Sequence, residues 1–187
     1  MRILGIDPGL DATGYGIIDV TNGNGSRAAS QDPLGSRLTI SDSLRLVEAG
    51  LIRTPAQSAL SDRLAVVAHA LQNLLAQHHP DCMAVEDLYS YYKTPQPAIL
   101  MGHVRGVVLS TAALAKIPVV SYLPTRIKKA VVGRGHAPKG QIAQMVQMRL
   151  RFEGNDVPPD VSDALAVALC HMETLRVEEL GVTRRRS

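Results

Sequence analysis

Four acidic residues stand where a protein could hold divalent metal ions. Asp7 ends an apolar run at the N-terminus, and Glu86 ends a second short apolar run. Asp160 and Asp163 are three residues apart near the C-terminus. Hard cations such as Mg²⁺ prefer oxygen ligands, and two of them about 3.5–4 Å apart can bind the attacking and leaving oxygens of a phosphodiester. The sequence therefore predicts metal-dependent phosphodiester hydrolysis if the fold brings the four carboxylates together.

The apolar runs before the first two acids have the pattern of buried strands. Residues 1–6 end at Asp7, where a Pro-Gly turn follows, and residues 81–85 end at Glu86. Buried strands of this kind belong to sheets that are covered by helices on both faces, and such sheets bind ligands at the carboxyl ends of their strands. We expect both acids at the same edge of one sheet.

A returning strand is predicted next to Asp7. Residues 13–18, with the sequence TGYGII, follow after a short turn and read as its antiparallel neighbour. Gly14 and Gly16 are expected to leave the backbone beside the acid open enough for a phosphate.

The last two acids are predicted to share one face of a helix. Proline is preferred in a first helical turn, so a helix is expected to begin at Asp160, after Pro158 and Pro159. The i, i+3 spacing then places Asp163 beside Asp160. Each acid alone has a simpler explanation, because negative charge is favourable at a helix N-terminus and Asp7 could cap a turn.

Taken together and in this order, the acids and the segments around them resemble the RuvC family of Holliday-junction endonucleases. The segments that carry the resemblance span nearly the whole chain: GIDPG at 5–9, TGYG at 13–16, VEDLY at 85–89, GHVRGV at 102–107, VVG at 131–133 and DVSDALA at 160–166. The resemblance implies an α/β fold like that of ribonuclease H, with a mixed five-stranded sheet flanked by helices. It also implies that the family's catalytic acids and metal ligands fall on Asp7, Glu86, Asp160 and Asp163.

The same resemblance implies an activity and its partners. We expect a structure-selective DNA endonuclease that resolves Holliday junctions by paired symmetric nicks, in homologous recombination and DNA repair. The expected cofactor is Mg²⁺, two ions per active site, with Mn²⁺ as a substitute. The expected partners are four-way junction DNA, a second copy of the chain in a homodimer, and the branch-migration proteins RuvA and RuvB. The expected location is the cytoplasm.

Basic residues concentrate in the segment 126–140, which is rich in glycine. The resemblance places DNA-contacting residues at Lys128 and Lys139, and Arg134 lies between them where phosphate could bind. His136, in the same segment, is the histidine that we would test as a general base.

Three of the five tyrosines follow Glu86 closely, at Tyr89, Tyr91 and Tyr92. Tyr89 matches a family position that is usually phenylalanine and that wedges into the open centre of the junction. Base–aromatic stacking contributes about 1 to 3 kcal/mol, and tyrosine keeps the stacking face. The segment is one residue longer than the common pattern, so any of the three could be the wedge.

Length and composition fit one soluble domain. The chain has 187 residues, 45% of them hydrophobic, a net charge of +3 and a pI near 9.0. We predict a single domain over residues 1–175, a polar hairpin insertion at 22–43 and a disordered basic tail at 176–187. No apolar run is expected to reach the roughly 20 residues that cross a bilayer, so no membrane is predicted. Cys82 and Cys170 are expected to be reduced core residues.

The remaining pattern predicts further helices and one more strand. Helices are expected at about 60–78, 94–116 and from 124, a strand at 119–122, and another helix at 138–150. In that last helix, Met145 and Met148 are expected to point inward. His103 and His171 are expected to be structural histidines with satisfied hydrogen bonds.

Two functions from other classes also fit parts of the pattern. An actin-like or sugar-kinase-type ATPase begins with a similar strand and Asp7, but it needs a second Asp-Gly-Gly phosphate loop, which this sequence does not contain. A noncatalytic junction-binding protein would keep Tyr89, Lys128 and Lys139, yet it would have no need for four metal ligands.

Overall fold

The fold is built on one mixed sheet. The structure, a computed structural model, describes residues 1–21, 43–88, 95–135, 138–152 and 157–179. Its strands are β1 (Arg2–Asp7), β2 (Ala12–Thr21), β3 (Ser43–Arg53), β4 (Cys82–Glu86) and β5 (Val119–Tyr122). They lie in the order β3-β2-β1-β4-β5, in which β1, β2 and β3 are antiparallel neighbours while β4 is parallel to both β1 and β5. The predicted mixed five-stranded sheet is confirmed.

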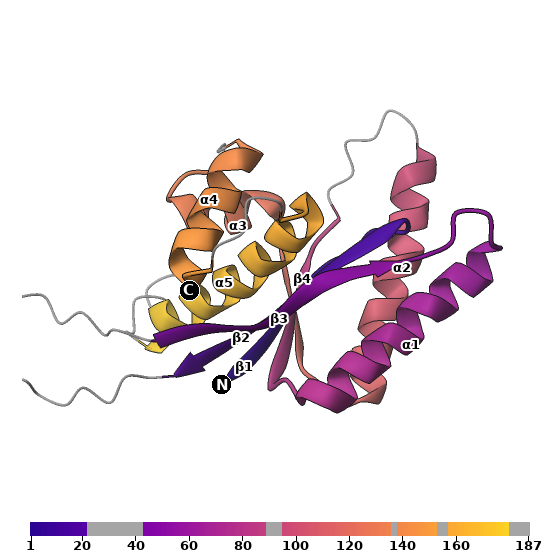
Figure 1. Cartoon of the computed structure of the whole chain (residues 1–187), viewed down its shortest axis with the longest axis horizontal. Coiled ribbons are helices and arrows are strands. Elements are labelled where there is room, and N and C mark those ends of the chain that lie inside the picture. Colours follow the sequence, from indigo (N-terminus) through magenta and orange to yellow (C-terminus); the bar gives the residue numbers. More distant parts are fainter. Residues whose placement is uncertain (22–42, 89–94, 136–137, 153–156, 180–187) are drawn as a thin grey trace, which may run out of the picture.

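Helices cover both faces of the sheet (Figure 1). One face carries α1 (Leu60–His78) and α2 (Pro95–Leu114), and the other carries α3 (Pro124–Val132), α4 (Lys139–Leu150) and α5 (Pro159–Glu179). Alternation along β1 explains the two cores, because successive strand residues point to opposite faces. Leu4 and Ile6 pack with α1 and α2, while Ile3 packs with α5.

The glycines of β1 and β2 let α5 lie directly on the sheet. A Cβ atom added at Gly5 would stand 2.1 Å from the Ala164 carbonyl oxygen, and one at Gly14 would stand 2.0 Å from that of Asp160. At Gly16 it would stand 2.4 Å from the Leu165 side chain. The expectation that Gly14 and Gly16 make room for a phosphate is therefore wrong, because the backbone of α5 fills that space at Gly14 and the Leu165 side chain fills it at Gly16.

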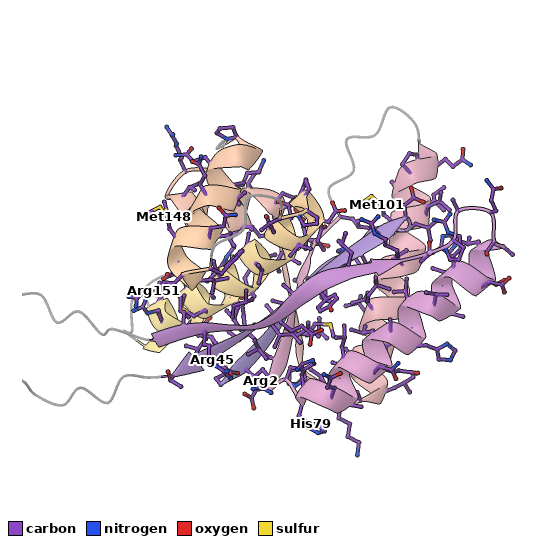
Figure 2. All side chains as sticks on the ribbon, viewed as in Figure 1. Arg2, Arg45, His79, Met101, Met148 and Arg151 are labelled. Carbon is purple, nitrogen blue, oxygen red and sulfur yellow. The ribbon has the colours of Figure 1, made fainter. Side chains whose placement is uncertain are left out.

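Most predicted helices are confirmed, but one methionine of α4 that was predicted to point inward faces solvent. The buried face of α4 is formed by Ile142, Val146 and Leu150, with Met145 packed beside it. Met148 lies about 200° around the helix from Val146. It is therefore 72% exposed, on the outside of the molecule (Figure 2), contrary to expectation.

Of the two histidines predicted to be structural, one is buried and the other is exposed. His171 is buried and its Nδ1 lies 2.7 Å from the Tyr122 hydroxyl, which confirms a structural histidine. His103 is exposed, because its neighbour Val104 occupies the buried face of α2, so the structural role predicted for it is wrong. Cys82 and Cys170 are buried free thiols, as predicted.

Two predicted boundaries concern the insertion and the C-terminal tail. The predicted insertion lies outside the described residues except for Ser43, which begins β3. Helix α5 continues to Glu179, beyond the tail boundary predicted at residue 175.

Helix α2 is more apolar than expected. By length and composition alone, its segment Gln96–Leu114 would suit a bilayer crossing, and only 22% of that window is buried. The expectation that no apolar run reaches this length is therefore wrong within the described part of the chain. Ile99 is 56% exposed and Leu114 is 81% exposed, so this helix presents an uncovered apolar surface.

Candidate active site

The first two acids lie at the ends of neighbouring parallel strands. Ile6 of β1 pairs with Val85 of β4, so Asp7 and Glu86 follow side by side at the same edge of the sheet. Because parallel strands point in one direction, their carboxyl ends meet at that edge. The two acids therefore take the arrangement that the strand pattern predicts.

The turn after Asp7 is fixed by a buried arginine. The guanidinium of Arg63, in α1, donates hydrogen bonds to the Leu10 carbonyl (3.2 Å) and the Thr54 hydroxyl (2.8 Å), and it pairs with Asp11. Thr54 also donates to the Leu10 carbonyl (2.6 Å). A buried charge that is satisfied in this way holds the turn rigidly.

The other two acids are delivered by the start of α5. Proline at the first helical position, Pro159, begins the helix, and Asp160 and Asp163 lie in its first turns. The absence of a side chain at Gly14 lets the Asp160 backbone lie against β2. The close contact between Gly14 of β2 and the start of α5 therefore also fixes where these two carboxylates lie relative to the sheet.

The electrostatics of Asp7 depend on the other three acids. Burial is the largest cause that raises the pKa of Asp7, to about 8, and the negative charge of Glu86 is the next. The charge of Asp163, a side-chain hydrogen bond with Glu86 and the charge of Asp160 raise the pKa further. Carboxylates this close cannot all ionise without a compensating positive charge.

A cleft of about 350 Å³ opens over the acids. Asp7, Glu86, Asp87 and Asp163 line it, and Lys128 of α3 lines it as well. Asp160 does not line the cleft, but its charge still raises the pKa of Asp7. A lysine beside a group of carboxylates suits a site that binds a phosphate next to metal ions.

The donor set fits a hard divalent cation. Carboxylate oxygens are the ligands that Mg²⁺ prefers, and the ion keeps several waters of its own. Within the described residues, no three acidic, histidine or cysteine side chains surround one point as metal ligands would. The crowding that raises the pKa of Asp7 is the repulsion that a bound cation would relieve.

The predicted DNA contacts have different outcomes. Lys128 lines the cleft. Arg134 is exposed and donates a 3.0 Å hydrogen bond to Gln141. Lys139 begins α4, but its side chain lies outside the described residues, as do Tyr89 and His136.

Sequence reasoning missed two residues beside the acids. Asp87 lines the cleft and pairs with Arg105 of α2 at 3.1 Å. Asp87 directly follows Glu86, so it could have been noted as a further acid at the strand end. No signal in the sequence links it with Arg105, which is 18 residues away.

The raised pKa of Asp7 gives a prediction about stability. In metal-free buffer the folded protein keeps the Asp7 proton up to about pH 8, whereas the unfolded chain loses it near 3.8. The stability that protonated Asp7 contributes is therefore complete below 3.8 and is lost as pH rises towards 8. We expect Asp7→Asn to become more stable than wild type by up to about 1 kcal/mol for each pH unit in this window. Urea unfolding of both proteins in EDTA, at about pH 5 and about pH 8, measures the difference; a difference that is equal at both pH values would contradict the raised pKa.

Comparison with known proteins agrees with the fold. Residues 36–171 match the family model of the crossover junction endodeoxyribonuclease RuvC. A RuvC of Rhodopirellula baltica is 44% identical over 168 residues, which cover 90% of this chain and 84% of that protein.

Solved structures show the same likeness. The Thermus thermophilus RuvC structure superposes with a TM-score of 0.79 and 30% identity, covering 95% of this chain and 97% of that one. The T. thermophilus RuvC in complex with a Holliday junction substrate gives a TM-score of 0.77 and 26% identity, covering 95% and 96%. The ribonuclease H-like fold expected from the sequence is therefore confirmed. The chain belongs to the RuvC family of crossover junction endodeoxyribonucleases.

Proposed function

We propose that this protein is a structure-selective DNA endonuclease that resolves Holliday junctions by hydrolysing phosphodiester bonds, in homologous recombination and DNA repair. The observation that carries the proposal is that Asp7, Glu86 and Asp163, from β1, β4 and α5, line one cleft. Burial and the charges of Glu86, Asp163 and Asp160 raise the pKa of Asp7 there. Family membership agrees with this chemistry.

Asp7, Glu86, Asp160 and Asp163 are the proposed catalytic residues and metal ligands. Asp7 is the central ligand, because pairing with Gly14 of β2 holds its backbone and the other three acids all raise its pKa. We propose two Mg²⁺ ions per site, which Mn²⁺ can replace. When bound, these ions supply a water nucleophile at neutral pH and stabilise the leaving oxygen.

The protein's own groups bind and orient the DNA strand. Lys128 shares the cleft with the carboxylates, so its ammonium group can bind a phosphate of the strand that is cut. Arg134 and Lys139 extend the proposed contact along the segment that leads into α4. Tyr89 follows Leu88, which lines the cleft, and it is the proposed wedge that stacks on an opened base pair.

The uncovered apolar surface of α2 supports a homodimer. An exposed Ile99 and Leu114 on one helix are stabilised when a second copy covers them. A twofold dimer presents two equal active sites to a four-way junction, which has matching symmetry. We propose that the two sites nick opposite strands, that RuvA and RuvB are partners, and that the protein works in the cytoplasm. Sedimentation equilibrium measures the dimer directly.

The first experiment compares cutting with binding. Purified protein is incubated with a synthetic four-way junction, and with a matched linear duplex, in Mg²⁺ and in EDTA. Paired symmetric nicks on the junction alone, only in Mg²⁺, would support the proposal. Tight junction binding without cuts would show a noncatalytic binder instead, despite the four carboxylates.

Lys128→Ala is expected to weaken junction binding. Loss of one phosphate contact should raise the Kd about tenfold at low salt and lower the slope of log K against log salt by about 1. Lys129→Ala is the matched control, since Lys129 is the next residue, is exposed and does not line the cleft. Fluorescence anisotropy over a salt series in EDTA measures both variants; equal effects of the two would remove the specific role of Lys128.

A further inference from the structure

The chain leaves the sheet after Glu86 through a hydrogen-bonded turn. The Asp87 amide donates to the Tyr122 carbonyl of β5 at 2.9 Å, which is the last backbone bond on that side. On the other side, the pairing of β4 with β1 already ends at Val85. Glu86 is the last residue of β4, so its position depends in part on what holds the residues that follow it.

Helix α2 holds those residues through Arg105. One carboxylate oxygen of Asp87, Oδ1, accepts a hydrogen bond from the Leu88 amide (3.0 Å) and pairs with the Arg105 guanidinium (3.1 Å). The same Arg105 nitrogen donates to the Ser121 hydroxyl at 2.8 Å. The guanidinium thus ties the turn after Glu86 to both α2 and β5.

A second part of α2 borders the same turn. Met101 of α2 lines the cleft, and the neighbouring Gly102 lies close enough to Leu88 that an added Cβ atom would stand 4.0 Å from its side chain. Leu88 and Asp87 both line the cleft. The part of the cleft next to Glu86, formed by Asp87 and Leu88, is therefore positioned by α2.

The pair is better suited to positioning than to stability. The side chains of Arg105 and Asp87 are 22% and 40% exposed, and exposed ion pairs contribute little to folding free energy. Arg105 Nε is buried without a hydrogen-bond partner among the described residues, so the side chain is kept in place at some cost. The Arg105–Asp87 pair therefore adds little to stability, and its main effect is to fix the position of the residue next to Glu86.

Helix α2 is also the helix that we have assigned to the dimer. Its packing within the chain is chiefly against α1, and its exposed apolar residues face outward. Any shift of α2 when a second copy docks would pass to the turn after Glu86 through Arg105.

We propose that Arg105 and Asp87 are positioning residues, which make the place of Glu86 depend on α2 and hence on the second copy. The inference rests on the proposed four-acid site and the proposed homodimer. It implies that Glu86 takes its catalytic position only when α2 contacts the second copy of the chain. The two nicks of one junction are then made by the same bound dimer, one soon after the other.

The test uses three variants of the full chain: Arg105→Gln, Asp87→Ala and the double variant. A displaced Glu86 should lower the single-turnover nicking rate at saturating junction by about 10- to 100-fold. Junction Kd in EDTA, the dimer measured by sedimentation and the melting temperature should stay near their wild-type values. The double variant should be no slower than the slower single variant, because the pair acts as one unit.

A second readout follows the order of the nicks. On a supercoiled plasmid that carries a cruciform junction, linked nicks give linear product, whereas separate nicks give nicked circles. Wild type should give linear DNA, and Arg105→Gln should accumulate nicked circles. A purely structural role for the pair would not change this ratio.

Arg45→Gln is the matched control. Arg45 forms a 2.7 Å ion pair with Asp19, and Figure 2 shows it at the end of the sheet away from Met101, which lines the cleft. This variant should cut like wild type.

Three results would overturn the inference while leaving the proposed function intact. Arg105→Gln could cut at the wild-type rate with linked nicks. Its slower cutting could follow entirely from a lost dimer or a lower melting temperature. The two single effects could multiply in the double variant, which would make Asp87 act independently of Arg105. A wild type that binds junctions without cutting them would instead remove the proposed function and this inference together.

Discussion

Asp7→Asn is expected to abolish junction cutting, by about 10³-fold or more, while junction binding is retained. Asparagine keeps the shape of the side chain, but it removes the carboxylate that is the proposed central metal ligand and that lies close to the other three acids. The DNA contacts proposed at Lys128, Arg134 and Lys139 do not involve this carboxylate. Single-turnover cutting in Mg²⁺ and anisotropy in EDTA separate the two effects.

The control for Asp7→Asn is Asp62→Asn. Asp62 is an exposed acid in the first turn of α1 and lines no part of the cleft. It should cut at the wild-type rate. Equal loss of cutting and binding in Asp7→Asn would argue against its role as a metal ligand, because the variant would then have lost the DNA site as well. Mg²⁺ should raise the melting temperature of wild type and leave that of Asp7→Asn nearly unchanged.

Gly14→Ala is expected to lower cutting by about 100-fold without changing any acid, because misplacement of about 1 Å can cost that much. The added methyl group would stand 2.0 Å from the Asp160 carbonyl oxygen and 2.5 Å from its carbon, so the start of α5 must move away from β2. Asp160 and Asp163 move with it. Overpacking of this kind also lowers stability by about 1 to 3 kcal/mol. Cutting rates and urea unfolding, measured on the same samples, test both statements.

Gly140→Ala provides the comparison for stability. Gly140 lies in α4, and nothing stands within 4 Å of its added Cβ position. Since alanine favours a helix over glycine, this variant should be as stable as wild type or slightly more so. If Gly14→Ala kept full activity, the contact between Gly14 and Asp160 would not control the place of the acids.

The elements with strong periodic patterns could be predicted from the sequence. The bounds of α1 agree with its apolar spacing, since Val67, Leu71 and Leu74 are buried along one face. The strands before Asp7 and Glu86 were visible as short apolar runs, because a strand covered on both faces has apolar residues throughout. Their shared direction then follows from the α/β pattern. For this reason the sequence alone predicts that Asp7 and Glu86 lie at the same edge of the sheet.

Features that depend on two distant segments could not be predicted in this way. Glycine beside an acid fits both an open phosphate site and a close helix contact, and only the position of α5 decides between them at Gly14. Similarly, a methionine in an amphipathic helix such as α4 can face either way, and Met148 faces solvent. The pairing of Arg105 with Asp87 joins α2 to a strand end, and no local pattern encodes it.

The burial of α5 determines where this enzyme can vary. Every residue from 164 to 172 is buried, so the helix that carries two of the acids is also the centre of the protein. Substitutions there disturb folding and chemistry at once, and selection or design for a new cutting preference would fail along this helix. Leu88 and Met101 also line the cleft, and both are only partly buried. Libraries for altered sequence preference should therefore be built on these two positions, with α5 kept constant.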